Sequence, residues 1–278
     1  MELAYLNGWL GPLEDAVVSV NDRGYIFGDG VYEVIRVYNG VMFAREEHFK
    51  RLAASAEAVH ITLPRGLMEL KDITEDVLSK SGIKEAMIYI QVTRGTAPRS
   101  HLPEAGLRPS LLITVRHIPE IPPAVYSEGV KVITVPEFRW QMCHVKSISL
   151  QASVLAKHKA QQAGAGEAVF VLPDGTVTEC ASSNIFIVKD GVLMTHPADH
   201  RILAGVIRYF ALEVADSLGL EVRVKPFNIS EMMQAEEVFI TGTVTEIVPV
   251  VNVDGNIIEN GRPGPVTRCI SNGYASLR

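Results

Sequence analysis

A short proline-rich segment near the middle of the chain limits how the chain can fold. Residues 117–124 have the sequence HIPEIPPA, with three prolines in eight positions. Proline cannot continue a helix or donate a hydrogen bond within a sheet, so an extended, semi-rigid connector is favoured here. With 278 residues, 47% of them apolar, the chain is long enough to bury two cores. We therefore expect an N-terminal α+β domain over 1–117, a linker over 118–124 and a C-terminal domain over 125–278.

The first domain is expected to mix antiparallel strands with helices. Asn39-Gly40 lies between two runs of β-branched and aromatic residues, a strong hairpin signal, so Val31–Tyr38 and Val41–Phe43 should pair. Apolar residues at three- and four-residue spacing then predict an amphipathic helix, namely Phe49, Leu52, Ala53, Ala56 and Val59. A helix over 67–81 and strands over 86–94 and 110–116 complete an α+β half.

The second half alternates strands and helices. Strands are expected over 130–135, 168–172, 184–188, 238–241 and 247–253, and helices over 150–163, over 204–218 and at the C-terminus. Pro173-Asp174-Gly175 and Asp190-Gly191 mark turns after strands. The fold class predicted for the whole chain is therefore two-domain, α+β or α/β.

Charge and composition favour small-molecule partners in the cytoplasm. The formal charge of −6 and the scattered lysines and arginines give no basic surface, so nucleic-acid binding is not expected. No export signal is recognisable and no apolar run reaches 18 residues, so neither secretion nor a membrane partner is expected. Three widely spaced cysteines, Cys143, Cys180 and Cys269, are expected to be free thiols.

Lys146 is the strongest candidate for a covalent amine catalyst. Such a lysine must lose its proton near neutral pH, and a partly desolvated position favours that loss. Lys146 has Val145 and Ile148 as near neighbours, whereas Lys71 and Lys157 lie in polar or helical surroundings. A lysine in an apolar stretch usually just extends its amine to water, so this pattern alone leaves both interpretations open.

A resemblance to a known family covers nearly the whole chain. Five segments occur in order at family-like spacing: DRGYIFGDGVYEVIRVYNG at 22–40, VTRGTAPRSH at 92–101, KSISL at 146–150, TECASSNIF at 178–186 and ITGTVTEIVPV at 240–250. The chain thus resembles the fold-type IV enzymes that depend on pyridoxal 5′-phosphate (PLP), the branched-chain/D-amino-acid aminotransferase family. The combination of GDGVYEV with RGTAPRSH is most similar to members specific for D-amino acids.

The resemblance implies a part in the chemistry for two residues. Lys146 matches the lysine that forms the Schiff base with PLP and moves the substrate proton. Glu179 matches the carboxylate that pairs with the pyridine nitrogen, and a carboxylate there keeps the ring protonated so that it accepts electrons. A solvated glutamate after a turn is the alternative for Glu179.

Cofactor binding is implied for a further set of residues. Arg51 matches the phosphate-binding arginine, although a helical arginine is more often at the surface. The backbone amides of Val206 and Ile207 open a predicted helix, where free N–H groups and the positive dipole end favour an anion. The remaining members of the set are Leu203 against the ring and Ser182, Ser183 and Thr243 near the cofactor. Ile207 and Gly242 replace a threonine and a serine of the resembled enzymes, so the phosphate contacts are expected to differ in detail.

The resemblance also implies how a substrate is held. An α-carboxylate suits a guanidinium fork, and Arg99 with His101 lies in a loop rich in Gly, Pro and Ser. Tyr32 is the third partner for that carboxylate. In the family this loop reaches into the neighbouring subunit's site, so a homodimer is implied. Without the resemblance, an exposed arginine and histidine in a mobile loop would be the simpler interpretation.

The predicted activity is PLP-dependent transamination between a D-amino acid and a 2-oxo acid such as 2-oxoglutarate or pyruvate. A branched-chain L-amino acid aminotransferase, an (R)-amine transaminase and an aminodeoxychorismate lyase have the same fold and are the nearest alternatives. Arg99-Ser100-His101 argues against the first and the last of these. The alternative of another class is a non-catalytic PLP-binding protein.

Three further patterns do not support other chemistry. His196 and His200 have a metal-like spacing, but Pro197 lies between them and no third ligand is near in sequence, so no metal is expected. Gly28-Asp29-Gly30 lacks the third glycine of a dinucleotide-binding motif. The GxSxG turn of many hydrolases does not occur.

Overall fold

The computed structural model describes residues 1–278 and divides them into two compact units. The first comprises Met1–Pro119 with Val145–Leu150, and the second comprises Glu120–His144 with Gln151–Arg278. The second unit therefore starts within the proline-rich segment. Residues 145–150, which the sequence interpretation assigned to the C-terminal domain, belong to the first unit. This short segment carries Lys146.

The first unit is built on a six-stranded antiparallel sheet with the order β2-β1-β6-β5-β3-β4. Its strands are β1 (Leu3–Leu6), β2 (Trp9–Pro12), β3 (Gly30–Tyr38), β4 (Val41–Met42), β5 (Ala86–Thr93) and β6 (Ser110–His117). The hairpin predicted at Asn39-Gly40 is confirmed, and both turn residues have the positive φ angles that such turns need, 51° and 84°. β1 and β2 were not predicted.

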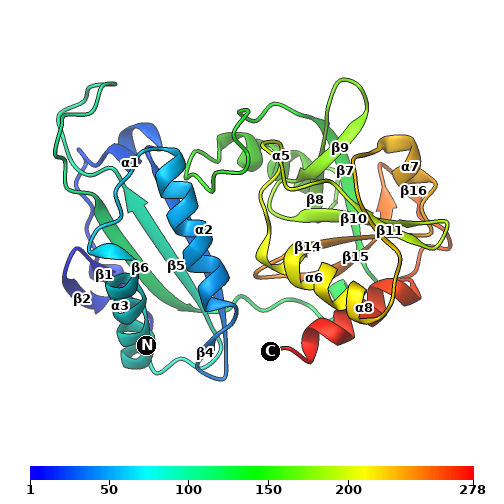
Figure 1. The fold of residues 1–278 in the computed structure, drawn as a ribbon, viewed down its shortest axis with the longest axis horizontal. Coiled ribbons are helices and arrows are strands. Elements are labelled where there is room, and N and C mark those ends of the chain that lie inside the picture. The colour runs from blue at the N-terminus through cyan, green and yellow to red at the C-terminus, as the bar shows by residue number, and fades with distance from the viewer. The chain divides into compact units, whose positions relative to one another are not determined.

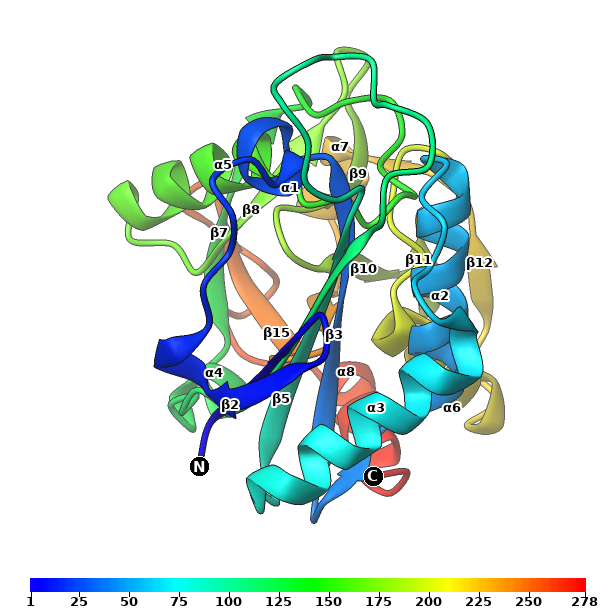
Figure 2. The same ribbon diagram turned by 90° about the vertical axis from the view of Figure 1, so that its left-hand side faces the viewer.

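Two longer helices cover one face of this sheet. α2 (Arg45–Ala58) packs on β3, and α3 (Gly66–Ser81) packs on β6 and β1 (Figure 1). Figure 2 shows both helices on the same side of β3 and β5. Phe49 and Leu52 of α2 are fully buried, as their helical spacing predicts, and Leu70 of α3 is fully buried as well. The short helices η1 (Leu13–Asp15) and α1 (Arg23–Phe27) precede β3.

The second unit contains a ten-stranded mixed sheet with the order β12-β11-β10-β14-β15-β7-β8-β9-β13, with β16 paired to β15. Its strands are β7 (Val130–Pro136), β8 (Glu167–Val171), β9 (Thr176–Cys180), β10 (Asn184–Lys189), β11 (Val192–Thr195), β12 (Val222–Val224), β13 (Phe227–Asn228), β14 (Glu237–Gly242), β15 (Glu246–Val253) and β16 (Asn256–Ile257). The five predicted strands are confirmed as β7, β8, β10, β14 and β15. The other five were not predicted.

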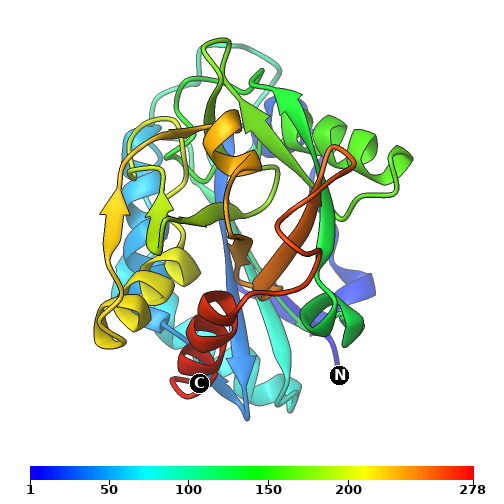
Figure 3. The same ribbon diagram turned by 90° about the vertical axis from the view of Figure 1, so that its right-hand side faces the viewer.

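The helices of the second unit are α4 (Ala124–Ser127), α5 (Gln151–Gln162), α6 (Val206–Ser217), α7 (Ile229–Met233) and α8 (Pro265–Ala275). α6, drawn in yellow, lies beside the red α8 in Figure 3, and both pack on β14. Phe186 of β10 and Phe239 of β14 stack with ring centroids 4.7 Å apart inside the core. No helix combines the length and apolar character that a membrane span requires.

Candidate active site

Lys146 lies on an extended segment that runs beside β3 in the first unit. Tyr32 N donates to Lys146 O at 2.9 Å, and Val31 forms an isolated antiparallel bridge with Ser147. On the other side, Lys146 N donates to Oγ of Ser55 in α2 at 3.1 Å. Its Nζ lies 4.2 Å from the centroid of the Tyr32 ring. The structure thus brings two predicted site residues, Lys146 and Tyr32, together.

Arg51 is joined to a fully buried carboxylate on the neighbouring strand. Its Nε donates to Oε2 of Glu33 at 2.9 Å and its Nη2 to Oε1 at 2.7 Å, which fixes the orientation of the guanidinium. Nδ1 of His48 lies 3.1 Å from Oε1 of Glu33. Burial of Glu33 favours its neutral form, but Arg51 and His48 more than offset this and hold its pKa well below the ordinary value. Glu33 and His48 were not predicted as site residues.

Arg99 and His101 lie together in the loop between β5 and β6, and both side chains are exposed. Cζ of Arg99 is 5.3 Å from the centroid of the Phe27 ring, and the His101 and Phe27 centroids are 5.4 Å apart. Tyr32 instead lines a cavity of about 630 Å³ in the same unit, together with Tyr89 and residues that do not include Arg99 or His101. The structure therefore places Arg99 and His101 beside the same phenyl ring, whereas Tyr32 lines a cavity to which neither contributes.

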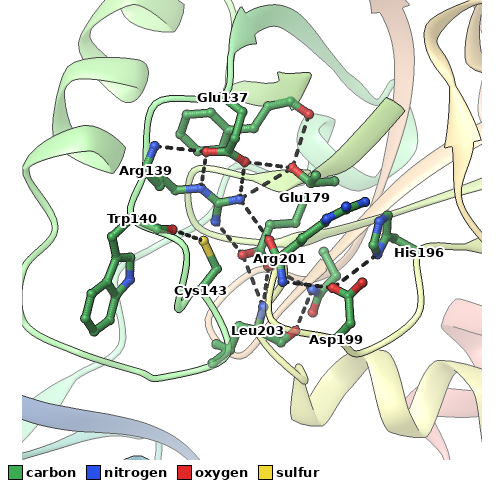
Figure 4. Close-up of polar contacts among 12 residues, drawn as sticks. Glu137, Arg139, Trp140, Cys143, Glu179, His196, Asp199, Arg201 and Leu203 are labelled. Carbon is green, nitrogen blue, oxygen red and sulfur yellow. Dashed lines mark hydrogen bonds and ion pairs between the residues drawn. The ribbon is translucent and has the colours of Figure 1, made fainter. Parts of the chain in front are cut away.

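Glu179 of β9 is buried in the second unit among hydrogen-bond donors (Figure 4). Arg139 donates through Nη1 to Oε1 at 2.5 Å, and Asn184 donates through Nδ2 to Oε2 at 3.0 Å. The backbone N–H of Leu203 contacts both carboxylate oxygens, at 3.1 and 3.2 Å. Burial raises the pKa of Glu179 to about 7, while Arg139 acts in the opposite direction. The solvated alternative for Glu179 is therefore wrong.

Arg139 is itself held by a second carboxylate. Its Nε and Nη2 donate to the two oxygens of Glu137 at 2.9 and 2.7 Å, and Thr178 Oγ1 also donates to Glu137 at 3.0 Å. Figure 4 shows the guanidinium between Glu137 and Glu179. Arg139 also lies over the Phe170 ring, with Cζ 4.3 Å from its centroid. Sequence reasoning missed this pair, although residues two apart on an extended chain project to the same side.

The first turn of α6 has the features of an anion site. Gly205 is the N-cap residue and no side chain caps the helix, so the first-turn amides, including those of Val206 and Ile207, receive no side-chain acceptor. A Cβ at 205 would lie 2.0 Å from Oδ1 of Asn184, so any larger residue there must displace Asn184 or the start of the helix. Asn184 also donates to Leu203 O at 2.9 Å. Asn184 therefore donates hydrogen bonds both to the Glu179 carboxylate and to the segment that leads into α6.

The remaining predicted residues are distributed around the same unit. Ser182 and Ser183 donate through Oγ to Oε2 of the buried Glu167, at 2.6 and 3.3 Å. Thr243 is half-buried in the connection between β14 and β15. Near it in sequence, Oγ1 of Thr241 is buried without a hydrogen-bond partner.

The histidine and cysteine patterns form no cluster of metal ligands. His196 lies in the connection that follows β11, where it is fully buried and its Nδ1 lies 2.9 Å from Pro197 O. Cys143, Cys180 and Cys269 are free, and only Cys269 is exposed.

Comparison with known proteins identifies the family. The model of amino-transferase class IV matches residues 30–253, which is most of the chain. The chain belongs to this family. A relative described as D-alanine aminotransferase from Bacillus licheniformis is 41% identical over 263 residues, covering 94% of this chain and 92% of the relative.

Solved structures of branched-chain amino acid aminotransferases have a similar fold. The branched-chain amino acid aminotransferase of Escherichia coli superposes with a TM-score of 0.93 at 29% identity, covering 99% of this chain and 94% of that one. A second branched-chain amino acid aminotransferase, solved with pyridoxamine 5′-phosphate, gives a TM-score of 0.92 at 28% identity, covering 99% and 93%. The predicted resemblance to the fold-type IV family is thereby confirmed.

Proposed function

We propose that this class IV aminotransferase moves an amino group between a D-amino acid and a 2-oxo acid, with PLP as cofactor. Its nearly full-length similarity to a D-alanine aminotransferase supports the substrate class. The observation that carries the cofactor assignment is Glu179, a fully buried carboxylate fixed by Arg139, Asn184 and Leu203. A ring nitrogen that must stay protonated needs such a fixed anion.

The residues present fit PLP. We assign Lys146 as the amine that binds it covalently and Glu179 as the partner of its ring nitrogen. Arg51 and the amides of Val206 and Ile207 are suited to its phosphate, since a fixed guanidinium and an uncapped helix start both favour anions. The assignment also puts Thr243 near the phosphate, Leu203 against the ring, and Ser182 and Ser183 near the cofactor.

When bound, PLP supplies an electron sink that weakens the Cα–H bond of the substrate amine. Lys146 Nζ would accept the Cα proton and deliver it to the cofactor carbon C4′, which leaves the amino group on the cofactor. Glu179 holds the ring nitrogen in its protonated form, and Arg139 favours the ionised carboxylate that this requires. Tyr32, Arg99 and His101 orient the substrate through its α-carboxylate.

We further propose that the protein works as a homodimer in the cytoplasm, with small amino acids and 2-oxo acids as its partners. The segment before and within α1 exposes Val17, Val18, Val20 and Tyr25, which are 80, 46, 73 and 78% exposed. Apolar side chains gathered in this way are typical of a surface that a second subunit covers. Free cysteines fit a reducing compartment.

The test is to load the purified protein with PLP and supply D-alanine, L-alanine or L-leucine in turn, each with 2-oxoglutarate. We expect turnover of D-alanine that yields D-glutamate, with Lys146→Ala as the inactive control. The fold similarity to branched-chain enzymes makes L-leucine the decisive alternative. Turnover of L-leucine alone would overturn the D-specific proposal. Binding of PLP without any amino transfer would show that the protein is a non-catalytic PLP-binding protein.

A further inference from the structure

A buried arginine outside the proposed catalytic set holds the loop that carries Arg99 and His101. Arg23 begins α1 and is only 4% exposed. Its Nη1 donates to Ser100 O at 2.5 Å and its Nη2 to His101 O at 3.1 Å. These two carbonyls are 77 and 78 residues away along the chain, so the contact connects α1 to the far part of the loop.

The backbone on either side continues this attachment. Arg23 N donates to Gly95 O at 2.9 Å, and Ala97 N donates to Asn21 O at 3.1 Å. Gly95 has a φ of +113°, and a Cβ there would lie 2.1 Å from Arg108 O, where the loop returns to β6. The base of the loop is therefore fixed by backbone bonds, while its exposed tip depends on the Arg23 side chain.

Phe27, at the other end of α1, provides the surface for the same side chains. Its ring has Arg23 Cζ at 4.8 Å and Arg99 Cζ at 5.3 Å from its centroid, beside the tilted His101 ring. Contacts of a guanidinium with an aromatic face are favourable. Arg23 thus sets the backbone of the loop, and Phe27 limits where its two functional side chains lie.

Arg23 is in turn fixed by a carboxylate that it shares with another arginine. Its Nε donates to Oδ2 of Asp29 at 2.7 Å. Arg94 also donates to Asp29, through Nε and Nη2, but its other bonds go to the carbonyls of Val59 and His60. The two arginines therefore have the same acidic partner, and only Arg23 contacts the loop carbonyls.

We propose that Arg23 is a positioning residue for substrate recognition, which fixes the 95–104 loop so that Arg99 and His101 present their side chains to the α-carboxylate of a D-amino acid. The proposal rests on the proposed function, because that function gives Arg99 and His101 their carboxylate. Arg23 itself does not contact the substrate. It supplies two charged hydrogen bonds to the loop backbone, and without them the tip keeps only the contacts of its side chains with Phe27.

The experiment compares Arg23→Met with the matched control Arg94→Met in the PLP-loaded full-length protein. Each variant removes one of the two arginines on Asp29, but only Arg23→Met removes the loop contacts. Hydrogen exchange of the amides in 96–104 is measured together with kcat, KM and the dissociation constant of PLP. We expect about tenfold faster exchange and about a tenfold higher KM for D-alanine in Arg23→Met, as the loss of charged hydrogen bonds implies. The value of kcat and PLP affinity should change less than about threefold, and Arg94→Met should leave loop exchange and KM near the wild-type values.

Arg23→Lys gives a second test if Arg23→Met does not fold. Lysine retains a cation for Asp29 but has no fork to reach two carbonyls, so loop exchange should still accelerate. Unchanged loop exchange in both Arg23 variants, or an equal rise in KM in Arg94→Met, would overturn the proposal. If the Arg23 variants accelerate loop exchange but the wild type does not turn over D-alanine, Arg23 still fixes the loop, and the proposed function is wrong.

Discussion

A buried carboxylate remains ionised only where its neighbours offset the loss of water, and Glu179 depends on Arg139 for this. Its pKa is about 7, raised by burial and limited by the guanidinium. Arg139→Met removes the opposing charge, so the pKa of Glu179 should rise further and the ionised form should require a higher pH. We expect the acidic limb of the kcat/KM profile to move to higher pH in this variant than in the wild type.

The control for this prediction is Arg223→Met, which breaks an exposed pair with Glu221. It should leave the pH profile unchanged, and Arg139→Lys should give a profile between those of the wild type and Arg139→Met. Glu137→Gln removes a nearby negative charge that raises the pKa of Glu179, so it should displace the limb in the opposite direction, by a smaller amount. An unchanged pH profile in Arg139→Met would show that Arg139 does not control the ionisation of Glu179.

Glu33 gives a prediction for stability. Its pKa lies well below the ordinary value of 4.5, because Arg51 and His48 more than offset its burial. Its ion pair therefore contributes stability above about pH 4.5, and this contribution is lost as the pH falls towards the lowered pKa. Glu33→Gln should reduce the free energy of unfolding at pH 7 by about 3 kcal/mol, since it leaves a buried guanidinium without its anion.

Urea unfolding at several pH values measures this difference. The deficit of Glu33→Gln relative to wild type should shrink as the pH is lowered below about 4.5, since protonation of Glu33 in the unfolded chain then favours unfolding of the wild type. Glu47→Gln is the matched control, because Glu47 is exposed on α2. If the difference in free energy of unfolding were the same at pH 7 and pH 4, Glu33 would contribute through packing and not through its charge.

Among the secondary-structure elements, the start of α6 is sensitive to a small change. A methyl group at 205 would lie 2.0 Å from Asn184 Oδ1, so Gly205→Ala must displace Asn184 or the helix start. Displacement disturbs both the amides proposed for the phosphate and the bond from Asn184 to Glu179. We expect PLP to bind at least about tenfold more weakly, which fluorescence titration measures. Gly166→Ala is the control, since a Cβ at 166 would meet nothing closer than 3.5 Å; equal affinities in the two variants would contradict the prediction.

The elements also show what the sequence could and could not predict. Periodicity was sufficient for the long elements, such as α2 and β3, because each carries its own apolar face. The short strands β12 and β13 were not predicted, since each is too short to show a periodic pattern and pairs with a strand that is distant in the chain, β11 and β9 respectively. The same limit applied to the site. The motif around Glu179 identified this residue, but Arg139 lies 40 residues earlier in the chain, and only folding brings its guanidinium to that carboxylate.

For the whole molecule, the central prediction is that two subunits complete each site. If the loop with Arg99 serves the neighbouring subunit, a Lys146→Ala chain retains an intact loop for its partner, and an Arg99→Ala chain retains an intact lysine. Mixing the two after dissociation should create dimers with one complete site. With random pairing, about half of the dimers are mixed, and about a quarter of wild-type activity should return at a D-alanine concentration below KM.

The activity that returns on mixing shows whether the loop serves the partner's site or the site of its own chain, because neither variant alone can produce this activity. A loop that served its own chain would leave every site in the mixed dimer short of either Lys146 or Arg99, and the activity would equal the mean of the two separate variants. Mixing without dissociation should also give no gain, since the parental dimers persist. Sedimentation at the assay concentration must show twice the 30.4 kDa chain mass, because recovery of activity in a monomer would contradict the shared site.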